Sequence, residues 1–244
     1  METVSVLIPA YNEEKRLPKT LGLWQEFMSR LSMRASNENN EFDIIEIIIV
    51  DDGSCDKTVQ LAESFNNLPI EIIRIMPNKG KGNAVRQGVK IAKGSFIFIY
   101  DADAAVLPQT LNILFTETKK SDIIIGSRTS FGSKTKMSFF RKFVGFCFHI
   151  FCYPLLTNIK DASCGAKLLK KTVAQKIFAE QKIDRFAFDI EMLWLAKKMN
   201  FRIKEVGINW REIPGSKVNV LRDAPEMFFS VLGLYKKDIL SKLK

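Results

Sequence analysis

Apolar runs alternate with segments of helical periodicity through the first half of the chain. Nearly continuous apolar runs predict buried strands at residues 4–10, 42–50, 70–76, 95–100 and 121–127. Between them, apolar residues recurring about every 3.6 positions predict helices within 13–31, 53–65, 82–93 and 107–119. Largely apolar strands separated by helices indicate a mainly parallel sheet with helices on both faces. The chain is therefore predicted to be an α/β protein.

Polar segments follow the predicted strands at the point where each strand ends. In a parallel sheet, ligands bind beyond the carboxyl ends of the strands, so we expect these segments to meet in one crevice. They are residues 9–14, 51–54, 101–103 and 126–128.

The segment 100–106, YDADAAV, places Asp101 and Asp103 two residues apart at a strand end. Side chains at i and i+2 of an extended chain point the same way, so both carboxylates can face one cation. Mg²⁺ and Mn²⁺ prefer oxygen ligands, although a polar strand end or a helix cap uses the same pattern. We expect Asp51 and Asp52 on the same rim, where a cation or hydrogen-bond donors must offset the repulsion among four carboxylates.

The segment 78–88, NKGKGNAVRQG, combines glycines with a predicted helix start. Glycines permit close backbone approach, and a helix start favours a bound anion. The spacing fits neither a P-loop nor a dinucleotide fingerprint. The sequence therefore predicts a nucleotide held by carboxylates and a metal.

The composition excludes some kinds of catalytic site and indicates a cellular location. The 244 residues are 46% hydrophobic, which is enough to build a core. The four cysteines show no CxxC spacing, so we expect reduced thiols, and the single histidine, His149, argues against Ser-His or Cys-His catalysis. No uncharged stretch reaches the roughly 18 residues of a membrane span and the N-terminus lacks signal-peptide features, so the expected location is cytoplasmic.

Positive charge is concentrated in the second half of the chain. Residues 1–133 carry 15 Lys and Arg against 17 Asp and Glu, whereas residues 134–244 carry 22 against 10. This balance predicts an anionic partner, either phosphate, membrane or nucleic acid. No RNA-recognition, helix-turn-helix or zinc-finger pattern is visible, so we expect no nucleic-acid partner.

Residues 137–156 form an apolar, aromatic stretch that is too short to span a bilayer. A buried core helix and an interfacial helix both fit this pattern. Together with the basic second half and the amphipathic tail, it favours peripheral contact with the cytoplasmic face of a membrane.

In its motifs, the chain resembles the family 2 glycosyltransferases of the GT-A fold. It is most similar to the dolichyl-phosphate β-glucosyltransferases and other polyprenyl-phosphate hexosyltransferases. The similarity runs nearly end to end, through PAYNEEKRLP, VDDGS, NKGKGNAVRQG, DADAA, GSR, KDASCGAKL, RFAFDIEMLWLA and NWREIPGSK.

The resemblance implies inverting transfer of a hexose from a nucleotide sugar to dolichyl or polyprenyl phosphate. UDP-glucose is the preferred donor, while UDP-N-acetylglucosamine, GDP-mannose and a soluble glycan acceptor stay open. Residues 1–133 are expected to form the sugar-nucleotide-binding core, and residues 134–244 the acceptor-binding and membrane-interface part with its C-terminal helices. The implied cofactor is Mg²⁺ or Mn²⁺ on Asp101 and Asp103, with Asp103 the more direct ligand.

The resemblance also assigns the remaining site residues. The donor site is expected to comprise Pro9, Ala10, Tyr11, Glu13, Asp52, Asp101, Trp210 and Lys217. Asp103, Asp161 and Arg128 are the expected catalytic residues. Arg128 and Arg141 suit the acceptor phosphate, because a guanidinium can hold two oxygens at once.

For three carboxylates, the sequence leaves two interpretations open. Asp161 either orients the acceptor or sugar, or is a structural partner of Lys160 or Lys167. Asp189 and Glu191 lie two apart on a predicted helix and do not share a face, so one can reach the site while the other is structural. Residues 161–168 read DASCGAKL where the glucosyl branch usually reads DTQCGFKL, and this departure bears on the identity of the donor sugar.

Overall fold

The computed structural model describes residues 1–35, 41–136, 139–215 and 220–242, without the side chains of 34–35, 136, 139–143, 220–222 and 241–242. A seven-stranded sheet forms its centre, in the order β3-β2-β1-β4-β7-β5-β8. The strands are β1 (Glu2–Ala10), β2 (Phe42–Asp51), β3 (Ile70–Arg74), β4 (Phe96–Tyr100), β5 (Ile123–Ser127), β7 (Ala166–Lys170) and β8 (Ile203–Gly207). All neighbouring pairs are parallel except those of β7, which runs antiparallel to both β4 and β5. The prediction of a mainly parallel α/β sheet is confirmed.

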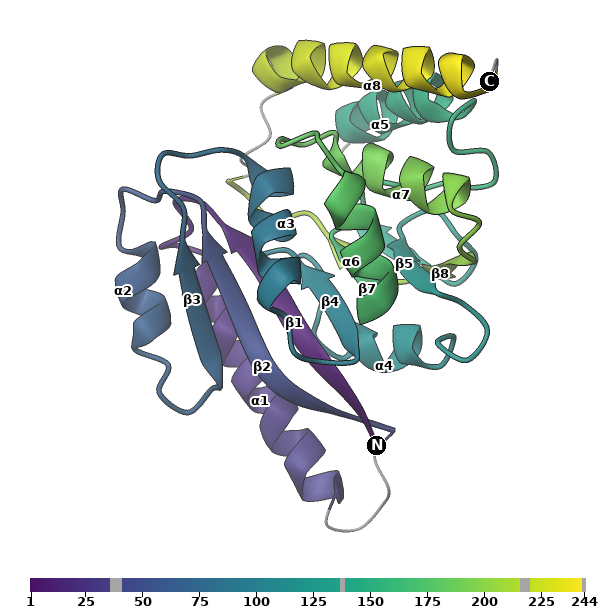
Figure 1. Cartoon of the computed structure of the whole chain (residues 1–244). Helices are drawn as coiled ribbons and strands as arrows, with labels where there is room; N and C mark the ends of the chain where they lie inside the picture. Colours follow the sequence, from purple (N-terminus) through teal and green to yellow (C-terminus); the bar gives the residue numbers. More distant parts are fainter. Residues whose placement is uncertain (36–40, 137–138, 216–219, 243–244) are drawn as a thin grey trace.

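Helices cover both faces of this sheet (Figure 1). They are α1 (Leu17–Ala35), α2 (Thr58–Glu63), α3 (Lys81–Ile91), α4 (Thr110–Phe115), α5 (Phe139–Cys152), α6 (Lys171–Glu180), α7 (Phe188–Lys198) and α8 (Val220–Lys242). Because successive strand residues face opposite sides, Leu7 packs in the core under α3, α6 and α7, whereas Ile8 packs in the core under α1 and α4.

The second half of the chain completes the sheet that the first half begins. β7 and β8 both come from beyond residue 134, and β6 (Lys134–Lys136) pairs in parallel with β9 (Asn209–Arg211) in a separate two-stranded ribbon. The division of roles at residue 133 stays a prediction.

Helices α5 and α8 lie together at one end of the molecule, beyond α7 (Figure 1). The rings of Phe151 and Phe228 stack with their centroids 4.6 Å apart, and the hydroxyl of Tyr235 donates to the carbonyl of Phe151. Within the described residues, no helix combines the length and apolar character needed to cross a bilayer.

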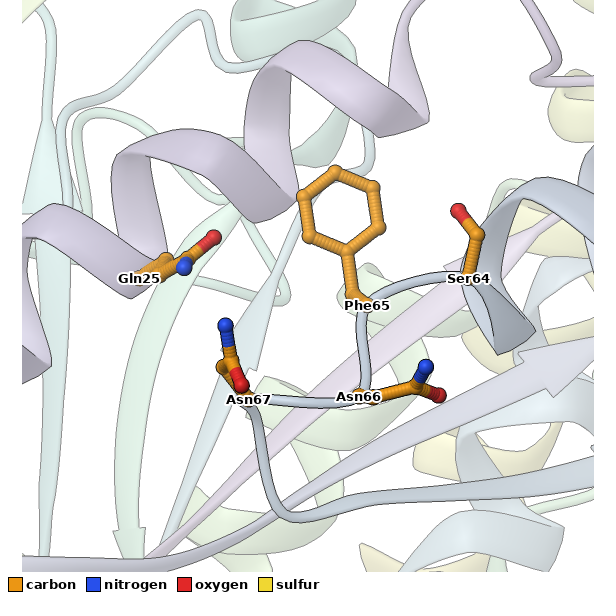
Figure 2. Close-up of a pocket in the computed structure, with 5 residues that line it drawn as sticks. All are labelled: Gln25, Ser64, Phe65, Asn66 and Asn67. Atoms are coloured by element: carbon orange, nitrogen blue, oxygen red, sulfur yellow. The ribbon is translucent and has the colours of Figure 1, made fainter.

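A small open hollow lies between α1 and the turn after α2 (Figure 2). Gln25 faces it from α1, and Ser64, Phe65, Asn66 and Asn67 line the other side. Its lining holds no charged side chain, so the chemistry predicted from the sequence has to be sought at the carboxyl ends of the strands instead.

Candidate active site

Asp101, the first residue after β4, is held between a lysine and a glycine. Its Oδ1 accepts a hydrogen bond of 2.6 Å from Nζ of Lys81, the first residue of α3. On the other side lies Gly165, where an added Cβ would stand 2.0 Å from Oδ2. Burial raises the pKa of Asp101, but the charge and hydrogen bond of Lys81 outweigh it and lower that pKa below its ordinary value. Asp101 is therefore an anion in a fixed orientation.

Asp103 has a different environment, although it lies two residues away. Its Oδ1 accepts from the backbone N–H of Ala105 at 3.0 Å, and Nη1 of Arg16 lies 3.8 Å from its Oδ2. Arg16 is itself held by Glu13, through an Nε to Oε2 bond of 2.6 Å and a second bond from Nη2. Burial, followed by the negative charge of Asp101, raises the pKa of Asp103. An arriving cation would relieve this repulsion.

Asp51 and Asp52 are held by donors of the protein itself. Asp52 accepts from Nδ2 of Asn78 at 2.8 Å and from the backbone N–H groups of Lys79 and Gly80 at 2.9 and 2.6 Å. Asp51 is fully buried, and Nε of Arg74 lies 3.4 Å from it. The sequence predicted that a cation or hydrogen-bond donors offset the repulsion among the four carboxylates. For Asp51 and Asp52 these are hydrogen-bond donors. Asp52 also holds the loop that precedes Lys81 in place.

The glycines of segment 78–88 admit another part of the same chain. An added Cβ at Gly80 would stand 2.5 Å from the carbonyl oxygen of Asp184, and one at Gly82 would stand 2.4 Å from that of Ile183. The Asp184 carbonyl also accepts from the N–H of Asn83 in the first turn of α3, at 2.9 Å. A carbonyl of the protein therefore occupies one N–H group of this helix start, and anion binding there stays a prediction.

Arg128 and Asp161 form a two-pronged ion pair beside the aspartates. Nε and Nη2 of Arg128 donate to the two carboxylate oxygens at 2.8 and 2.6 Å, and its backbone N–H donates at 2.7 Å. The guanidinium carbon lies 5.5 Å from the ring centroid of Trp210 in β9. Burial raises the pKa of Asp161, yet Arg128 lowers it below its ordinary value. The partner of Asp161 is thus Arg128, and the pairing with Lys160 or Lys167 was wrong.

A second buried ion pair lies behind Asp101. Nζ of Lys167, in β7, is 2.7 Å from Oδ1 of Asp189, and Lys167 is only 1% exposed. Glu191 instead accepts from the backbone N–H groups of Lys182 and Ile183, at 2.9 and 2.6 Å. Asp189 therefore holds Lys167, and Glu191 holds the backbone before α7; which of these two carboxylates reaches the site stays a prediction.

The remaining predicted residues fall into two groups. Ala10 ends β1 and is buried, Glu13 is buried beside Arg16, and Tyr11 is 39% exposed at the same edge. Lys217 lies outside the described residues, and Arg141 belongs to the part of α5 whose side chains are not described. Sequence reasoning missed Arg16 and Lys81 as members of the site. The signal for Lys81 was its place between two glycines in GKG.

The aspartate pair fits a hard divalent cation that shares its shell with a ligand. Within the described residues, no cluster of three or more His, Cys, Asp and Glu side chains could hold a metal by itself. Mg²⁺ is commonly bound by one or two carboxylates, with substrate phosphates and water completing the shell. Asp101 and Asp103 supply that number of ligands, and a cation between them would offset the negative charge of Asp101 that helps to raise the pKa of Asp103.

Solved structures of other proteins share this fold. Mannosyl-3-phosphoglycerate synthase from Rubrobacter xylanophilus superposes with a TM-score of 0.69 at 19% identity, over 99% of this chain and 75% of that one. Glucosyl-3-phosphoglycerate synthase from Mycobacterium tuberculosis, in complex with Mn²⁺, UDP-glucose and phosphoglyceric acid, gives 0.67 at 16% identity, over 95% and 80%. The predicted GT-A fold is confirmed.

Sequence comparison identifies the family. The model of glycosyl transferase family 2 matches residues 5–178. The dolichyl-phosphate beta-glucosyltransferase of Dictyostelium discoideum is 36% identical over 257 residues, which cover 96% of this chain and 76% of that protein. The human protein of the same name is 34% identical over 88% of this chain and 69% of its own length. The chain is therefore a glycosyltransferase and belongs to glycosyl transferase family 2.

Proposed function

We propose that this chain transfers a hexose, preferably glucose from UDP-glucose, to dolichyl or polyprenyl phosphate with inversion at the anomeric carbon. The observation that carries the proposal is the Asp101–Asp103 pair with Lys81 and Arg16 beside it, a set that suits a metal-bound diphosphate. Relatives named dolichyl-phosphate beta-glucosyltransferase support the acceptor, and the M. tuberculosis structure with Mn²⁺ and UDP-glucose supports the donor.

The reaction is a single displacement. A phosphate oxygen of the acceptor attacks the anomeric carbon, the bond from that carbon to the diphosphate breaks, and the nucleoside diphosphate leaves with the bonding electrons. An α-linked donor thereby gives a β-linked product. A phosphomonoester has a second pKa of about 6, so it is largely ionised near pH 7 and needs no strong general base.

The residues of the chain act on charge and orientation in this scheme. Asp101 and Asp103 would hold Mg²⁺ or Mn²⁺, which when bound stabilises negative charge on the leaving diphosphate. The cationic groups of Lys81 and Arg16 favour the same charge. Trp210 and Lys217 are proposed to close near the diphosphate, with Pro9, Tyr11 and Asp52 around the base and ribose.

The acceptor phosphate is assigned to Arg128 and Arg141 in this proposal. Arg128 already gives two donors to Asp161, so that pair orients the guanidinium rather than leaving it mobile. Asp161 is then a positioning residue, whose carboxylate sets where Arg128 can meet the phosphate.

We further propose that the protein meets a membrane surface through α5 and α8. Seven exposed apolar side chains on these two helices, together with Tyr153 directly after α5, make up what we call the α5–α8 surface, and α8 also carries the exposed Lys236. Basic charge in the second half of the chain supports attraction to anionic lipid. The eight are Phe146, Ile150, Tyr153, Phe228, Phe229, Leu232, Ile239 and Leu240.

A radiolabel transfer assay tests the chemistry. Polyprenyl phosphate and Mg²⁺ or Mn²⁺ are supplied with UDP-glucose, UDP-N-acetylglucosamine or GDP-mannose, and a water-soluble glycan serves as the alternative acceptor. We expect a metal-dependent glucolipid that Asp103→Ala abolishes. Asp43→Ala is the matched control, because Asp43 is exposed at the opposite end of the strands. Product on the glycan alone, or none with any donor, would contradict the proposal.

Vesicle flotation tests the membrane contact separately. We expect Phe229→Ser with Leu232→Ser to lower binding to phosphatidylserine vesicles by about a hundredfold, because each side chain contributes roughly 1.5–3 kcal/mol when buried. Transfer to a short-chain, water-soluble polyprenyl phosphate should be unchanged. Ile113→Ser removes an exposed side chain from α4 and is the control. Equal flotation of all three proteins would refute this contact.

A further inference from the structure

The cation that neutralises Asp101 in this structure is a side chain of the chain itself. Nζ of Lys81 lies 2.6 Å from Oδ1 of Asp101, one of the two carboxylates proposed to hold the metal ion. The Lys81 side chain is 23% exposed and passes 5.9 Å from the ring centroid of Phe188. Lys81 therefore competes with any cation that approaches Asp101.

The Asp101 side chain cannot rotate away from Lys81. Gly165 lies so close that a single added carbon would overlap Oδ2. A cation that binds Asp101 must therefore displace the Lys81 ammonium or share the carboxylate with it.

Lys81 is also the more easily displaced of the two cations at the aspartates. Arg16 is tied to Glu13 by two hydrogen bonds and stays 3.8 Å from Asp103. Among the described residues, the Lys81 ammonium has a single hydrogen-bond partner, Asp101, and it sits at the end of a flexible four-carbon stem.

The ammonium of Lys81 acts oppositely on the two ligands. It repels a metal ion that approaches Asp101, whereas it attracts a diphosphate. A diphosphate that draws Lys81 off the carboxylate would therefore favour the metal, and a metal on Asp101 would free Lys81 for the diphosphate.

We propose that Lys81 couples the binding of the metal to the binding of the nucleotide diphosphate. It neutralises Asp101 until both ligands are present, then gives up that carboxylate to the cation and contacts the diphosphate. The inference rests on the proposed function, because it takes a metal and a nucleotide diphosphate as the ligands.

Calorimetric titration tests this coupling without any measurement of activity. Wild type, Lys81→Met and Lys81→Arg are titrated with Mn²⁺ alone, UDP alone, and UDP at saturating Mn²⁺. Lys79→Met is the matched control, because Lys79 is an exposed lysine two residues away whose side chain has no partner among the described residues. Thermal unfolding without ligand verifies that each variant folds.

In wild type, each ligand should raise the affinity for the other by about tenfold or more, and this factor is the same in both directions. Lys81→Met should bind Mn²⁺ alone about tenfold more tightly, because the competing ammonium is gone, and its coupling should fall below about threefold. Its melting temperature should also rise more with Mn²⁺ than that of wild type. Lys81→Arg and Lys79→Met should keep the wild-type coupling.

Two results would overturn the inference in different ways. If folded Lys81→Met binds Mn²⁺ with wild-type affinity and unchanged coupling, Lys81 does not compete for the site, while the proposed function stands. If wild type itself binds neither Mn²⁺ nor UDP, the proposed function fails and the role of Lys81 fails with it.

Discussion

The substitution Gly165→Ala tests whether the orientation of Asp101 depends on the missing side chain at position 165. The new Cβ would stand 2.0 Å from Oδ2 and 2.3 Å from Cγ of Asp101, whereas ordinary contact begins at 3.4 Å. The carboxylate oxygen must therefore move by about 1.4 Å. A misplacement of about 1 Å at a reacting centre can cost roughly a hundredfold in rate.

We expect kcat/KM for glucolipid formation to fall by about a hundredfold in Gly165→Ala, with a weaker dependence on Mn²⁺. Overpacking should lower the free energy of unfolding by only about 1–3 kcal/mol, so the protein stays folded. Gly22→Ala is the control, because nothing lies within 4 Å of its added Cβ in α1, and it should gain about 0.5–1 kcal/mol. A folded Gly165→Ala protein whose kcat/KM stays within about threefold of wild type would refute the reasoning.

Two ion pairs allow further tests by urea unfolding. Arg128→Ala should cost about 3–5 kcal/mol, because Asp161 is left buried without its partner, and adding Asp161→Asn should recover part of this loss. No recovery in the double variant would show that the charge is not the cause. Hydrogen bonds from Arg202 hold the pKa of Asp122 below its ordinary 3.8, so the folded chain binds fewer protons there than the unfolded chain. The stability that Asp122 contributes is therefore full above about pH 5 and is lost as the pH falls below 3.8. Asp122→Asn should make the free energy of unfolding fall less steeply at acid pH. Parallel curves of this free energy against pH for the two proteins would contradict the assignment.

The sequence predicted β1 to β5 because those strands are apolar runs, but it did not reveal β7 or the parallel edge strand β8. Strand β7 reads AKLLK, and two lysines in five residues are not typical of a central buried strand. Lys167 is nevertheless buried there because Asp189 neutralises it from α7. A pairing between residues so far apart in the chain leaves no local pattern.

The site shows the same division between local and distant signals. Asp101 and Asp103 were predicted because a strand end and a two-residue spacing are both local. Lys81 and Gly165 were not predicted to meet Asp101, because one precedes it by 20 residues and the other follows it by 64. For residues 137–156 the sequence favoured an interfacial helix over a buried one. Phe151 packs against the core and Phe146 is 61% exposed, and contact with a membrane stays a prediction.

The late position of the antiparallel strand β7 in the chain determines when, during synthesis, the site can form. A chain leaving the ribosome completes β4 and β5 well before residues 166–170 emerge, and these two strands do not pair with each other. Until β7 fits between them, each has an unpaired edge open to other chains. Gly165, which fixes Asp101, immediately precedes β7. A nascent chain therefore orders Asp101 against Gly165 only after β7 has been inserted between β4 and β5.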